Sequence, residues 1–580
     1  MGYPTPGIDT QLPAGALAVL KSDDTLGSAN FFDRCRALST TREVPILFLD
    51  KPFRIVDDTP IRELSLDQLQ RYRTILAAWY LRRATAHGDV VAVCVEDGIA
   101  PFLHYLALTS VGATIALINP AMAAPVGVAY MRDNGFDALV TDSHTAATSP
   151  FVGEWRAAGG ATCIGDEQNA AGAIGTGDLR AAADLPHWWP LAPQDSTLVM
   201  LSHTSGTTGL PKAVRFEHRQ FFMGKRARIG TFSRGADERL LTALPQSHSS
   251  AISHLETAVL HGISTFVLST QDGAALRAAI ARFAPTTVAA FPKSYMLLAE
   301  GGVTDNEFPS VQRWFSMGDA AHQSHVRRVL VGAPQSRFID AFGSSELGMA
   351  LFRCESTLDA LAPCRCIGRP VDIAVAKILD ADTGEEVAAG KAGLLAVRSP
   401  TITSGYWRKP GVTGQAWRGG YFLTGDVAYC ADGAFYQIDR AVDVVATAAG
   451  PLYTLELEEA AQQVPDVCDV SVVGMAPGET ARARVLAVVL PERRAGRDAS
   501  AIADDVSRAL RLAIAERLGL EDADVADMIA VAIVYEHALL PTGATGKVLK
   551  RQLRDAAASF LERPASTHQP APDTIVHAAS

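Results

Sequence analysis

The sequence lacks three features that would assign it to a specialised class. It has no basic excess: 52 Lys and Arg stand against 63 Asp and Glu, a formal charge of -11, which argues against a nucleic-acid partner because phosphate backbones need a basic stripe. Its most apolar stretches, such as AVLHGISTFVLS (258–269), are too short to span a bilayer. Its eight cysteines are scattered without a C-x-x-C pair, so we expect reduced thiols and no zinc site.

The opening residues, MGYPTPGIDTQLPAG, also lack the basic segment and apolar core of a signal peptide. We therefore expect a cytoplasmic protein. At 580 residues the chain is too long for one hydrophobic core. Its apolar content of 48% and charged content of 20% are ordinary for a globular protein, which predicts several packed units.

The order of apolar runs predicts an α/β fold. About thirty loop-like residues come first, and then Val-rich strands such as VVAVCV (90–95) alternate with helical patterns, which is typical of parallel sheets covered on both faces. Short strands with turns follow residue 366, and an α+β segment follows residue 440 with helices expected at 499–518 and 547–560. The expected division is an N-terminal core at 1–438 (α/β subdomains at 30–190 and 191–365, a β-rich subdomain at 366–438), a C-terminal domain at 439–560 and a disordered tail at 561–580.

One loop carries the first chemical signal. Residues 201–214 read LSHTSGTTGLPKAV, a strand that runs into an unbroken series of hydroxyl and glycine residues followed by Lys212. Glycines let the backbone approach an oxyanion, and clustered N–H groups and hydroxyls donate to it. The spacing is not that of a Walker loop, because Lys212 follows Gly209 by three residues and is followed by Ala213. The segment predicts a phosphate-binding loop rather than a flexible linker.

TSGTTGLPKAV resembles the phosphate loop of the adenylate-forming superfamily, which comprises acyl- and aryl-CoA ligases, adenylation domains of peptide synthetases and luciferases. Further motifs follow in the family's order: LPQSH (244–248), FGSSE (342–346), IGRP (367–370), GYW (405–407), YFLTGD (421–426) and PTGATGK (541–547). The resemblance covers about residues 45 to 555. It implies two parallel-type α/β sheets and a β-rich subdomain in a large N-terminal domain, with a mobile α+β lid after it. No carrier domain follows, so we expect a stand-alone enzyme.

The resemblance also implies ATP and Mg²⁺ as cofactors and assigns roles to individual residues. Thr204, Ser205, Gly206, Thr207, Thr208, Gly209 and Lys212 would hold the β- and γ-phosphates, and Ser345 would help to position a phosphate. Glu346 would bind Mg²⁺, a hard cation that prefers oxygen ligands. Asp426 would accept the ribose hydroxyls, and Arg440 would support the ribose or close the contact between the domains. Gly318 and Asp319 fall in the adenine-binding segment, Phe342 would pack against the base, and Gly343 belongs to the same nucleotide site. His248 would lie near the substrate carboxylate, with His254 as an alternative.

Lys547 is expected to contribute most to catalysis. It follows Gly546 and is predicted to open a helix (VLKRQLRDAAASFL), where a basic residue opposes the helix dipole. By resemblance it would bridge the substrate carboxylate and the α-phosphate. Three of the other assignments have simple structural alternatives: Asp426 could cap a turn, Glu346 could be a solvated loop carboxylate, and His248 could be an ordinary loop histidine.

The hinge segment departs from the family pattern. Asp439 replaces a glycine, Val442 occupies the hinge position, and Ala446 replaces a lysine. The glycine expected near the pantetheine tunnel falls one place late, at Gly450, and Pro451 follows it. A displaced glycine and a stiff proline weaken the case for thioester formation, because close backbone approach needs a missing side chain.

Two readings of the acceptor therefore stay open. The first is activation of a small carboxylic acid, aryl or short and unsaturated, as an acyl-AMP with transfer to CoA or a carrier thiol. The second keeps the adenylation but replaces the thiol by an amine or by nitrite, as in the diazotising relatives of the family. A non-catalytic nucleotide-binding relative is disfavoured, because Lys212, Glu346, Asp426 and Lys547 are all present.

Overall fold

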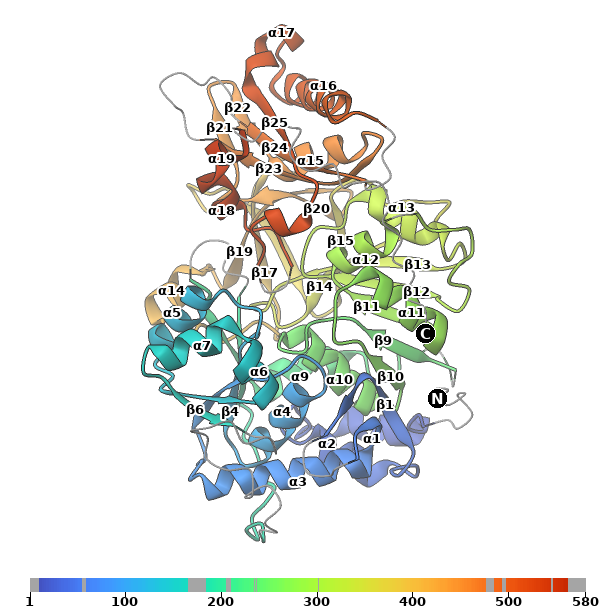
Figure 1. Ribbon diagram of the computed structural model, residues 1–580, viewed down its shortest axis with the longest axis vertical. Helices are drawn as coiled ribbons and strands as arrows, with labels where there is room; N and C mark the ends of the chain where they lie inside the picture. The colour runs from blue at the N-terminus through green and yellow to red at the C-terminus, as the bar shows by residue number, and fades with distance from the viewer. Residues whose placement is uncertain are drawn as a thin grey trace, which may run out of the picture. The chain divides into compact units, whose positions relative to one another are not determined.

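The computed structural model describes residues 10–54, 59–164, 184–204, 210–233, 235, 237–300, 302–475, 485–492, 497–543 and 546–561. The chain forms two compact units (Figure 1). The first consists of Met1–Ala299, Val303–Gln437 and Gly543–Lys547, and the second of Glu300–Gly302, Ile438–Thr542 and Val548–Ser580. Within the described segments, no helix is both long and apolar enough to cross a bilayer.

A smaller sheet in the first unit has the strand order β6-β5-β3-β4-β7-β8. Its ladders are parallel except for the β7–β8 pair, as strand–helix alternation predicts. Its strands are β3 (Val90–Cys94), β4 (Thr114–Leu117), β5 (Ala138–Thr141), β6 (Ala161–Ile164), β7 (Leu198–His203) and β8 (Ala213–Glu217). The helices that accompany it along the chain are α3 (Leu66–Arg82), α4 (Ala100–Ser110), α5 (Ala124–Asn134), α6 (Ser143–Thr148), α7 (Pro150–Ala157) and α9 (His218–Ala227).

A larger sheet of fourteen strands, counted over the described residues, has the order β16-β17-β19-β20-β15-β14-β13-β12-β11-β9-β10-β1-β2, with β18 paired to β19. The ladders from β1 through β10, β9, β11 and β12 to β13 are parallel, whereas β13, β14 and β15 pair antiparallel. The parallel part contains β1 (Pro45–Phe53), β9 (Arg239–Thr242), β10 (Ser264–Val267), β11 (Thr287–Ala290), β12 (Arg313–Met317) and β13 (Arg337–Gly343), with β2 (Ile61–Ser65) at the edge. Its helices are α10 (Ser249–His261), α11 (Gly273–Phe283), α12 (Pro292–Ala299) and α13 (Gln323–Val331).

The β-rich segment after residue 366 continues the same sheet. β14 (Ala350–Ser356) precedes this segment. The segment itself contains β15 (Cys366–Pro370), β16 (Val375–Leu379), β17 (Gly393–Arg398), α14 (Pro410–Gln415), β18 (Trp417–Arg418), β19 (Tyr421–Ala431) and β20 (Ala434–Arg440). An Asp-Gly turn joins the last two strands, with positive φ at both Asp432 and Gly433, as a two-residue hairpin turn requires.

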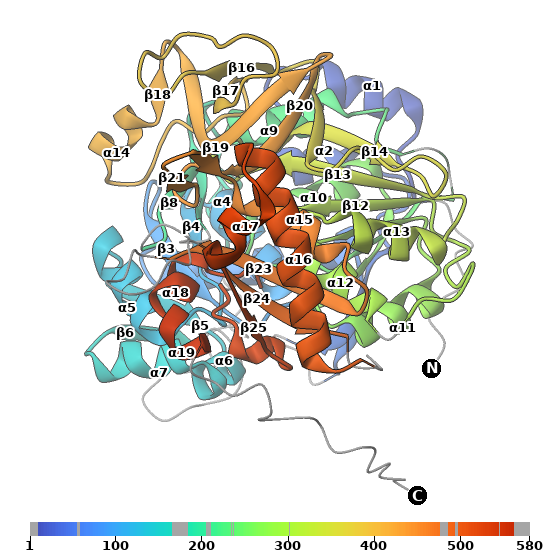
Figure 2. The same cartoon turned by 90° about the horizontal axis from the view of Figure 1, so that it is seen from above.

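The two sheets exchange strands, so the sequence-based division at residue 190 is wrong. β1 and β2 come from the first sixty-five residues but pair at the edge of the larger sheet, whereas β7 and β8 come from 198–217 and complete the smaller one. Figure 2 shows the smaller sheet and the strands β12–β14 as separate layers of the first unit. Strand texture alone cannot assign a strand to a sheet, because adjacent sheets of the same type have the same apolar pattern.

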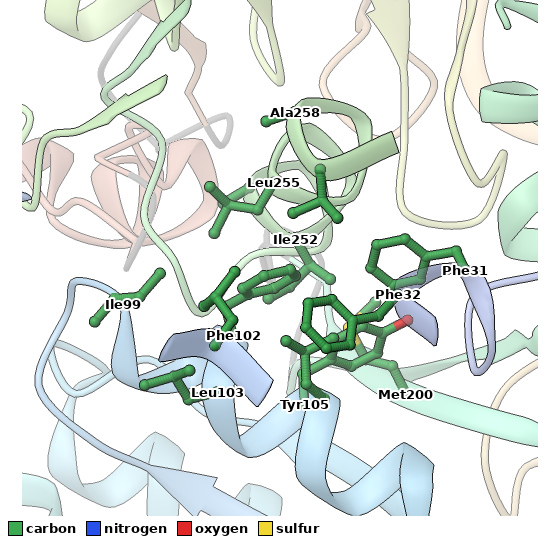
Figure 3. Packing of buried hydrophobic residues seen from close by; sticks show 14 of the residues in the cluster. Phe31, Phe32, Ile99, Phe102, Leu103, Tyr105, Met200, Ile252, Leu255 and Ala258 are labelled. Carbon is green, nitrogen blue, oxygen red and sulfur yellow. The ribbon is translucent and has the colours of Figure 1, made fainter. Parts of the chain in front are cut away.

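A large apolar core joins the two sheets in the first unit. Phe102 and Tyr105 of α4 pack with Ile252 and Leu255 of α10 and with Phe31 of α2 (Phe31–Leu38), all fully buried (Figure 3). This cluster fixes α10 against α4, so the side chains at the start of α10 are held by a rigid support.

The second unit is a small α+β domain with the sheet order β23-β24-β25. Its elements are β21 (Val445–Thr447), β22 (Gly450–Leu452), α15 (Thr454–Gln462), β23 (Val467–Gly474), β24 (Val485–Pro491), α16 (Ala499–Leu518), α17 (Asp522–Val525), β25 (Ile529–Ile533), α18 (Lys550–Asp555) and α19 (Ala557–Leu561). The inner faces of α15 and α16 pack on the sheet around Leu457, Val472 and Leu510.

Two local predictions were wrong, and one lies beyond the described residues. The N-terminal segment is not all loop, because α1 (Ala14–Ser22) forms there and buries Leu20; an Ala-rich helix held by one anchor has too short an apolar period to recognise. The last predicted helix begins at Lys550 rather than at Lys547 and is interrupted at Ala556. Residues 562–580 lie outside the described residues.

Candidate active site

Two hydrogen bonds close the base of the loop between β7 and β8. The Thr204 N–H donates to the Lys212 carbonyl over 3.0 Å, and the Lys212 N–H donates to Thr204 Oγ1 over 3.0 Å. The residues predicted to cradle phosphates between them, Ser205, Gly206, Thr207, Thr208 and Gly209, lie outside the described residues. Thr204 and Lys212 therefore give the position of the loop's two ends.

Tyr406 connects Lys212 with Glu346. Its hydroxyl donates to Glu346 Oε1 over 3.0 Å and lies 3.4 Å from Lys212 Nζ, which also sits 4.4 Å from the centre of the tyrosine ring. The Glu346 carbonyl accepts the Thr403 N–H over 2.8 Å. The carboxylate is thus half-buried and hydrogen-bonded to Tyr406.

Two neutral imidazoles lie beside this loop. His248 caps the N-terminus of α10, where its Nδ1 accepts the Ser250 N–H over 3.2 Å. Burial, with a smaller effect from nearby His203, lowers the pKa of His248 to about 3, and burial also lowers the pKa of His203. Because Nδ1 of His248 is an acceptor, the proton of its neutral ring lies on Nε2. His248 can therefore donate a hydrogen bond to an anion, but it cannot accept a proton there.

His203 has the opposite tautomer. Its Nδ1 lies 3.3 Å from the Thr204 carbonyl oxygen, which can only accept, so Nδ1 carries the proton. Its Nε2 is then an unprotonated acceptor, and it is buried without a hydrogen-bond partner among the described residues. A buried acceptor left unpaired costs about 1–3 kcal/mol, which makes His203 a candidate for contact with a substrate donor.

Phe291 links these histidines to the predicted adenine segment. Its ring meets the His248 ring edge to face at a centroid distance of 5.4 Å. The ring also lies 2.7 Å from the place where a Cβ on Gly318 would stand, and Gly318 has φ +89°. A side chain at residue 318 would be excluded twice, by backbone conformation and by contact.

Lys547 forms an ion pair with the residue after this glycine. Its Nζ lies 2.7 Å from Asp319 Oδ1 within the first compact unit. The Gly543 N–H donates to the Lys547 carbonyl over 2.8 Å, so the lysine belongs to a tight loop. This corrects the prediction that Lys547 opens a helix, and the argument from the helix dipole does not apply.

Asp426 lies inside strand β19, not in a turn, so its alternative reading as a turn cap is wrong. The carboxylate is buried and accepts Gln437 Nε2 over 2.8 Å. Gln437 Oε1 in turn accepts Arg365 Nη2 over 3.1 Å. The arginine thereby orients the amide, and the amide orients the carboxylate.

Asp340 on β13 is a half-buried carboxyl of this unit. Burial raises the pKa of Asp340 to about 7; nearby Asp319 raises it further and Arg365 opposes both effects. Three residues further along the chain, a Cβ on Gly343 would stand 2.5 Å from the Met349 carbonyl oxygen, so a glycine is required there. Phe342 meets Phe352 at a centroid distance of 5.6 Å, and Ser345 is half-buried.

The second unit holds Arg440 and the hinge residues. The Thr454 hydroxyl donates to Asp439 Oδ1 over 3.0 Å. Lys550 Nζ donates to the oxygen of that hydroxyl, Thr454 Oγ1, over 2.8 Å. Burial raises the pKa of Asp439 to about 6 against the effect of Lys550. The Arg440 N–H donates to Asp439 Oδ1 over 2.8 Å. Val442 is 53% exposed, as a residue in a solvent-facing connection would be.

The departures from the hinge pattern fall on the β21–β22 hairpin. Ala446 pairs with Pro451, and Thr447 pairs with Gly450, whose φ is +139°. Pro451 has no N–H to donate across this short ladder.

The donor set suits a magnesium ion held mostly by phosphate. In the described ranges no group of three or more His, Cys, Asp and Glu could hold a metal. Glu346 stands as a single half-buried carboxylate beside the ammonium of Lys212. Mg²⁺ commonly binds to one or two carboxylates plus substrate phosphates, so the residues fit such an ion.

Comparison with known proteins assigns the family. The family model described as "AMP-binding enzyme" matches residues 49–407. The chain belongs to this family. It is 32% identical over 575 residues to a 3-aminoavenalumate diazotase from a Streptomyces species, with 93% of this chain and 97% of the relative covered.

More distant relatives of this AMP-binding enzyme are CoA ligases. A 3-hydroxybenzoate/4-hydroxybenzoate–CoA ligase from Thauera aromatica is 27% identical, with 82% of this chain and 88% of the relative covered. Among solved structures, an anthranilate CoA ligase in complex with anthranoyl-AMP has a TM-score of 0.75 at 19% identity, covering 93% of this chain and 99% of that one. The predicted fold class and the prediction of an adenylate-forming ligase are confirmed.

Side-chain contacts and neighbouring positions along the chain connect the predicted residues of the AMP-binding enzyme's first unit into one series. Lys212 bonds Thr204, the adjacent His203 neighbours His248, Phe291 joins His248 to Gly318, and Asp319 joins Lys547. Sequence reasoning missed Tyr406, His203 and Gln437. Tyr406 stands in the quoted GYW motif and His203 directly before the loop, so both positions carried a signal; Gln437 carried none, because its role depends on strand pairing.

Proposed function

We propose that this AMP-binding enzyme is an ATP-dependent diazotase that activates nitrite and transfers the nitrosyl group to an aryl amine. The observation that carries the proposal is the similarity to the 3-aminoavenalumate diazotase. It extends over 93% of this chain at 32% identity, against 82% of the chain at 27% identity for the hydroxybenzoate–CoA ligase.

The β21–β22 hairpin supports an acceptor other than a thiol. A pantetheine arm needs a glycine whose missing side chain admits it, and the corresponding glycine of this chain is displaced to Gly450 beside Pro451. Ala446 also removes the lysine of the family pattern. A small nucleophile or an aryl amine needs no such passage.

The proposed reaction balances without an external oxidant or reductant. A nitrite oxygen attacks the α-phosphorus of ATP, the bond to pyrophosphate breaks, and a mixed anhydride of nitrous acid and AMP forms. The amine nitrogen then attacks the nitrosyl nitrogen, an N–N bond forms, and AMP leaves with the bridging oxygen. The resulting N-nitrosamine gains a proton on oxygen and loses water to give the diazonium ion.

The proposed roles follow the predicted assignments. Lys212 and the loop Thr204, Ser205, Gly206, Thr207, Thr208 and Gly209 hold the triphosphate, Ser345 assists, and Glu346 holds Mg²⁺. Gly318, Asp319, Phe342 and Gly343 line the adenine, and Asp426 and Arg440 bind the ribose. Lys547 stabilises the charge that develops as pyrophosphate leaves.

The two imidazoles take distinct parts in this proposal. His248 donates its Nε2–H to the nitrite or α-phosphate oxygen. The unprotonated Nε2 of His203 accepts a hydrogen from the amine as its nitrogen attacks. Their low pKa values keep both rings neutral, so neither adds a charge to the anionic reactants.

The test separates the possible acceptors in one experiment. The purified enzyme is incubated with MgATP and a panel of aminoaryl acids, with and without nitrite and with and without CoA. AMP is quantified, and diazonium is trapped with 2-naphthol as an azo dye. We expect AMP and azo dye in equal amounts only when nitrite and an amine are both present, and neither with Lys547→Ala. Nitrite-independent AMP release coupled to a thioester would instead identify a CoA ligase.

A further inference from the structure

Two arginines in the first unit stand without an acidic partner. Arg228 follows the C-terminus of α9, and Arg353 lies on β14. Neither guanidinium forms an ion pair among the described residues, and Nε of Arg353 is buried without a hydrogen bond there. Both side chains are half-buried, so each guanidinium is partly withdrawn from water without an acidic partner among the described residues. A partly desolvated charge gains from an anionic partner.

Their two elements meet directly. A Cβ on Gly224 of α9 would stand 2.2 Å from Met349 Sδ, one residue before β14 begins. Arg228 Nε donates to the Gly224 carbonyl over 3.0 Å, which anchors its side chain at this contact. Arg228 is therefore held close to the start of β14.

The pairing of β14 places Arg353 on the same side of the sheet as this contact. Arg353 is opposite Ala341 of β13, so it shares a face with Ile339 two residues earlier. Ile339 belongs to the core cluster that contains Ile252 and Leu255 of α10. Figure 3 shows the side chains of Ile252 and Leu255. Arg353 thus faces α9 and α10.

The pKa shifts agree with this placement. Burial lowers the pKa of Arg228 to about 10, and Arg353 adds to the effect. Burial lowers the pKa of His254 on α10 to about 4, and the charge of Arg228 lowers it further. Arg228 therefore lies within electrostatic range of both Arg353 and His254.

The other buried charges nearby are already neutralised. Lys225 pairs with Glu256 at 2.5 Å, and Tyr105 donates to the same carboxylate over 2.6 Å. Arg313 pairs with Glu238 at 2.6 Å. Glu355, which opposes the pKa shift of Arg353, is exposed and bound to Arg337 at 3.1 Å. Two positive charges remain at Arg228 and Arg353, where an anionic ligand would neutralise them.

The distance along α10 from His248 to His254, the histidine near Arg228, indicates the class of ligand. His248 at the helix N-terminus belongs to the nucleotide side of the site, and His254 lies six residues further, roughly 9 Å along the axis. This span suits an aryl ring with a carboxylate on a short chain. Guanidinium groups bind carboxylates through paired N–H donors.

We propose that Arg228 and Arg353 bind the carboxylate of an aminoaryl carboxylic acid whose amine points toward His248. The inference rests on the proposed diazotase function, since the carboxylate would then be a recognition group and not the group that is adenylated. The substrate therefore binds in one orientation, with its carboxylate at Arg228 and Arg353 and its amine toward the nucleotide.

The test compares 3-aminocinnamate with its neutral methyl amide in the nitrite-dependent azo-dye assay. We expect the wild-type enzyme to prefer the acid by about 10- to 100-fold in kcat/KM, the range for a charge-assisted hydrogen bond. Arg228→Gln and Arg353→Gln should abolish this preference by raising KM for the acid alone, and Arg228→Lys should restore part of it. Arg219→Gln, at the opposite end of α9, is the matched control.

The outcomes separate the two proposals. If azo dye forms but the acid has no advantage, or Arg228→Gln affects both compounds equally, the carboxylate site is refuted and the diazotase function stands. If no amine gives azo dye, calorimetric binding of 3-aminocinnamate without ATP or nitrite decides the site: equal affinity in wild type and Arg228→Gln refutes it. Nitrite-independent adenylation of the acid would refute both proposals.

Discussion

Removing the Tyr406 hydroxyl should weaken the handling of MgATP without unfolding the enzyme. Tyr406→Phe keeps the ring that is buried in the core and that faces Lys212 Nζ at 4.4 Å. It deletes the hydrogen bond to Glu346 Oε1, 3.0 Å long. The carboxylate then loses the contact that fixes its direction, while the packing of the ring is unchanged.

The size of the effect follows from the partners. A hydrogen bond to a charged group contributes about 1.5–3 kcal/mol, and the half-buried Glu346 can recover part of this from water, so we expect a net loss of about 1–2 kcal/mol. That loss corresponds to a decrease of about 5- to 30-fold in kcat/KM for MgATP. The Mg²⁺ concentration for half-maximal rate should rise in parallel.

The assay is AMP release at saturating nitrite and amine while MgATP is varied. Tyr429→Phe, whose ring stacks on Tyr436 at 4.7 Å, is the control for loss of a hydroxyl elsewhere in the first unit. In a double-mutant cycle with Glu346→Gln, the second substitution should cost less in the Tyr406→Phe background. Unchanged MgATP and Mg²⁺ dependence in Tyr406→Phe, or strictly additive losses, would refute the bridging role.

Three further predictions concern the nucleotide site and the core. Lys547→Ala should lower pyrophosphate exchange by about 10²–10³-fold, the loss of a cation at a developing charge, with an unchanged melting temperature; near-native exchange would contradict its role. Gln437→Leu should raise KM for ATP by about 3- to 10-fold through loss of one hydrogen bond to Asp426, measured with the same AMP assay, and an unaltered KM would mean that Asp426 needs no support. Burial lowers the pKa of His104 to about 4. As the pH falls from about 6.5 toward 4, His104 is therefore protonated in the unfolded chain but not in the folded state. The folded state should therefore lose about 1 kcal/mol from His104 between pH 7 and pH 5.5; urea titrations of His104→Gln should show a smaller pH effect than wild type, and an equal effect would exclude this histidine.

Motifs that act through consecutive residues could be predicted from the sequence. Thr204 and Lys212 were placed correctly at one loop, because glycines, hydroxyls and lysines in fixed order leave few alternative structures. The strand predicted at 90–95 likewise matches β3 closely.

Relations between distant segments could not be predicted in the same way. Tyr406 reaches Glu346 across sixty residues, and Gln437 reaches Asp426 across a hairpin. The pairing of Arg228 with Arg353 depends on the contact of a helix end with a strand, and each residue alone has no distinguishing neighbour in the sequence. The helix predicted from Lys547 was wrong: basic residues and an apolar period were present, but the helix begins at Lys550, and the Lys547 carbonyl instead accepts the Gly543 N–H.

The exchange of strands between the two sheets constrains how this protein can be made. During synthesis, β1 cannot form its parallel ladder until β10, more than two hundred residues later, has left the ribosome. The smaller sheet likewise stays incomplete until β7, the partner of β4, has been synthesised. Pairing across such separations is slow and leaves apolar strands unprotected meanwhile. Truncations at residue 190 should accordingly yield aggregates in place of half-enzymes, and chaperone supply should limit the yield of active protein.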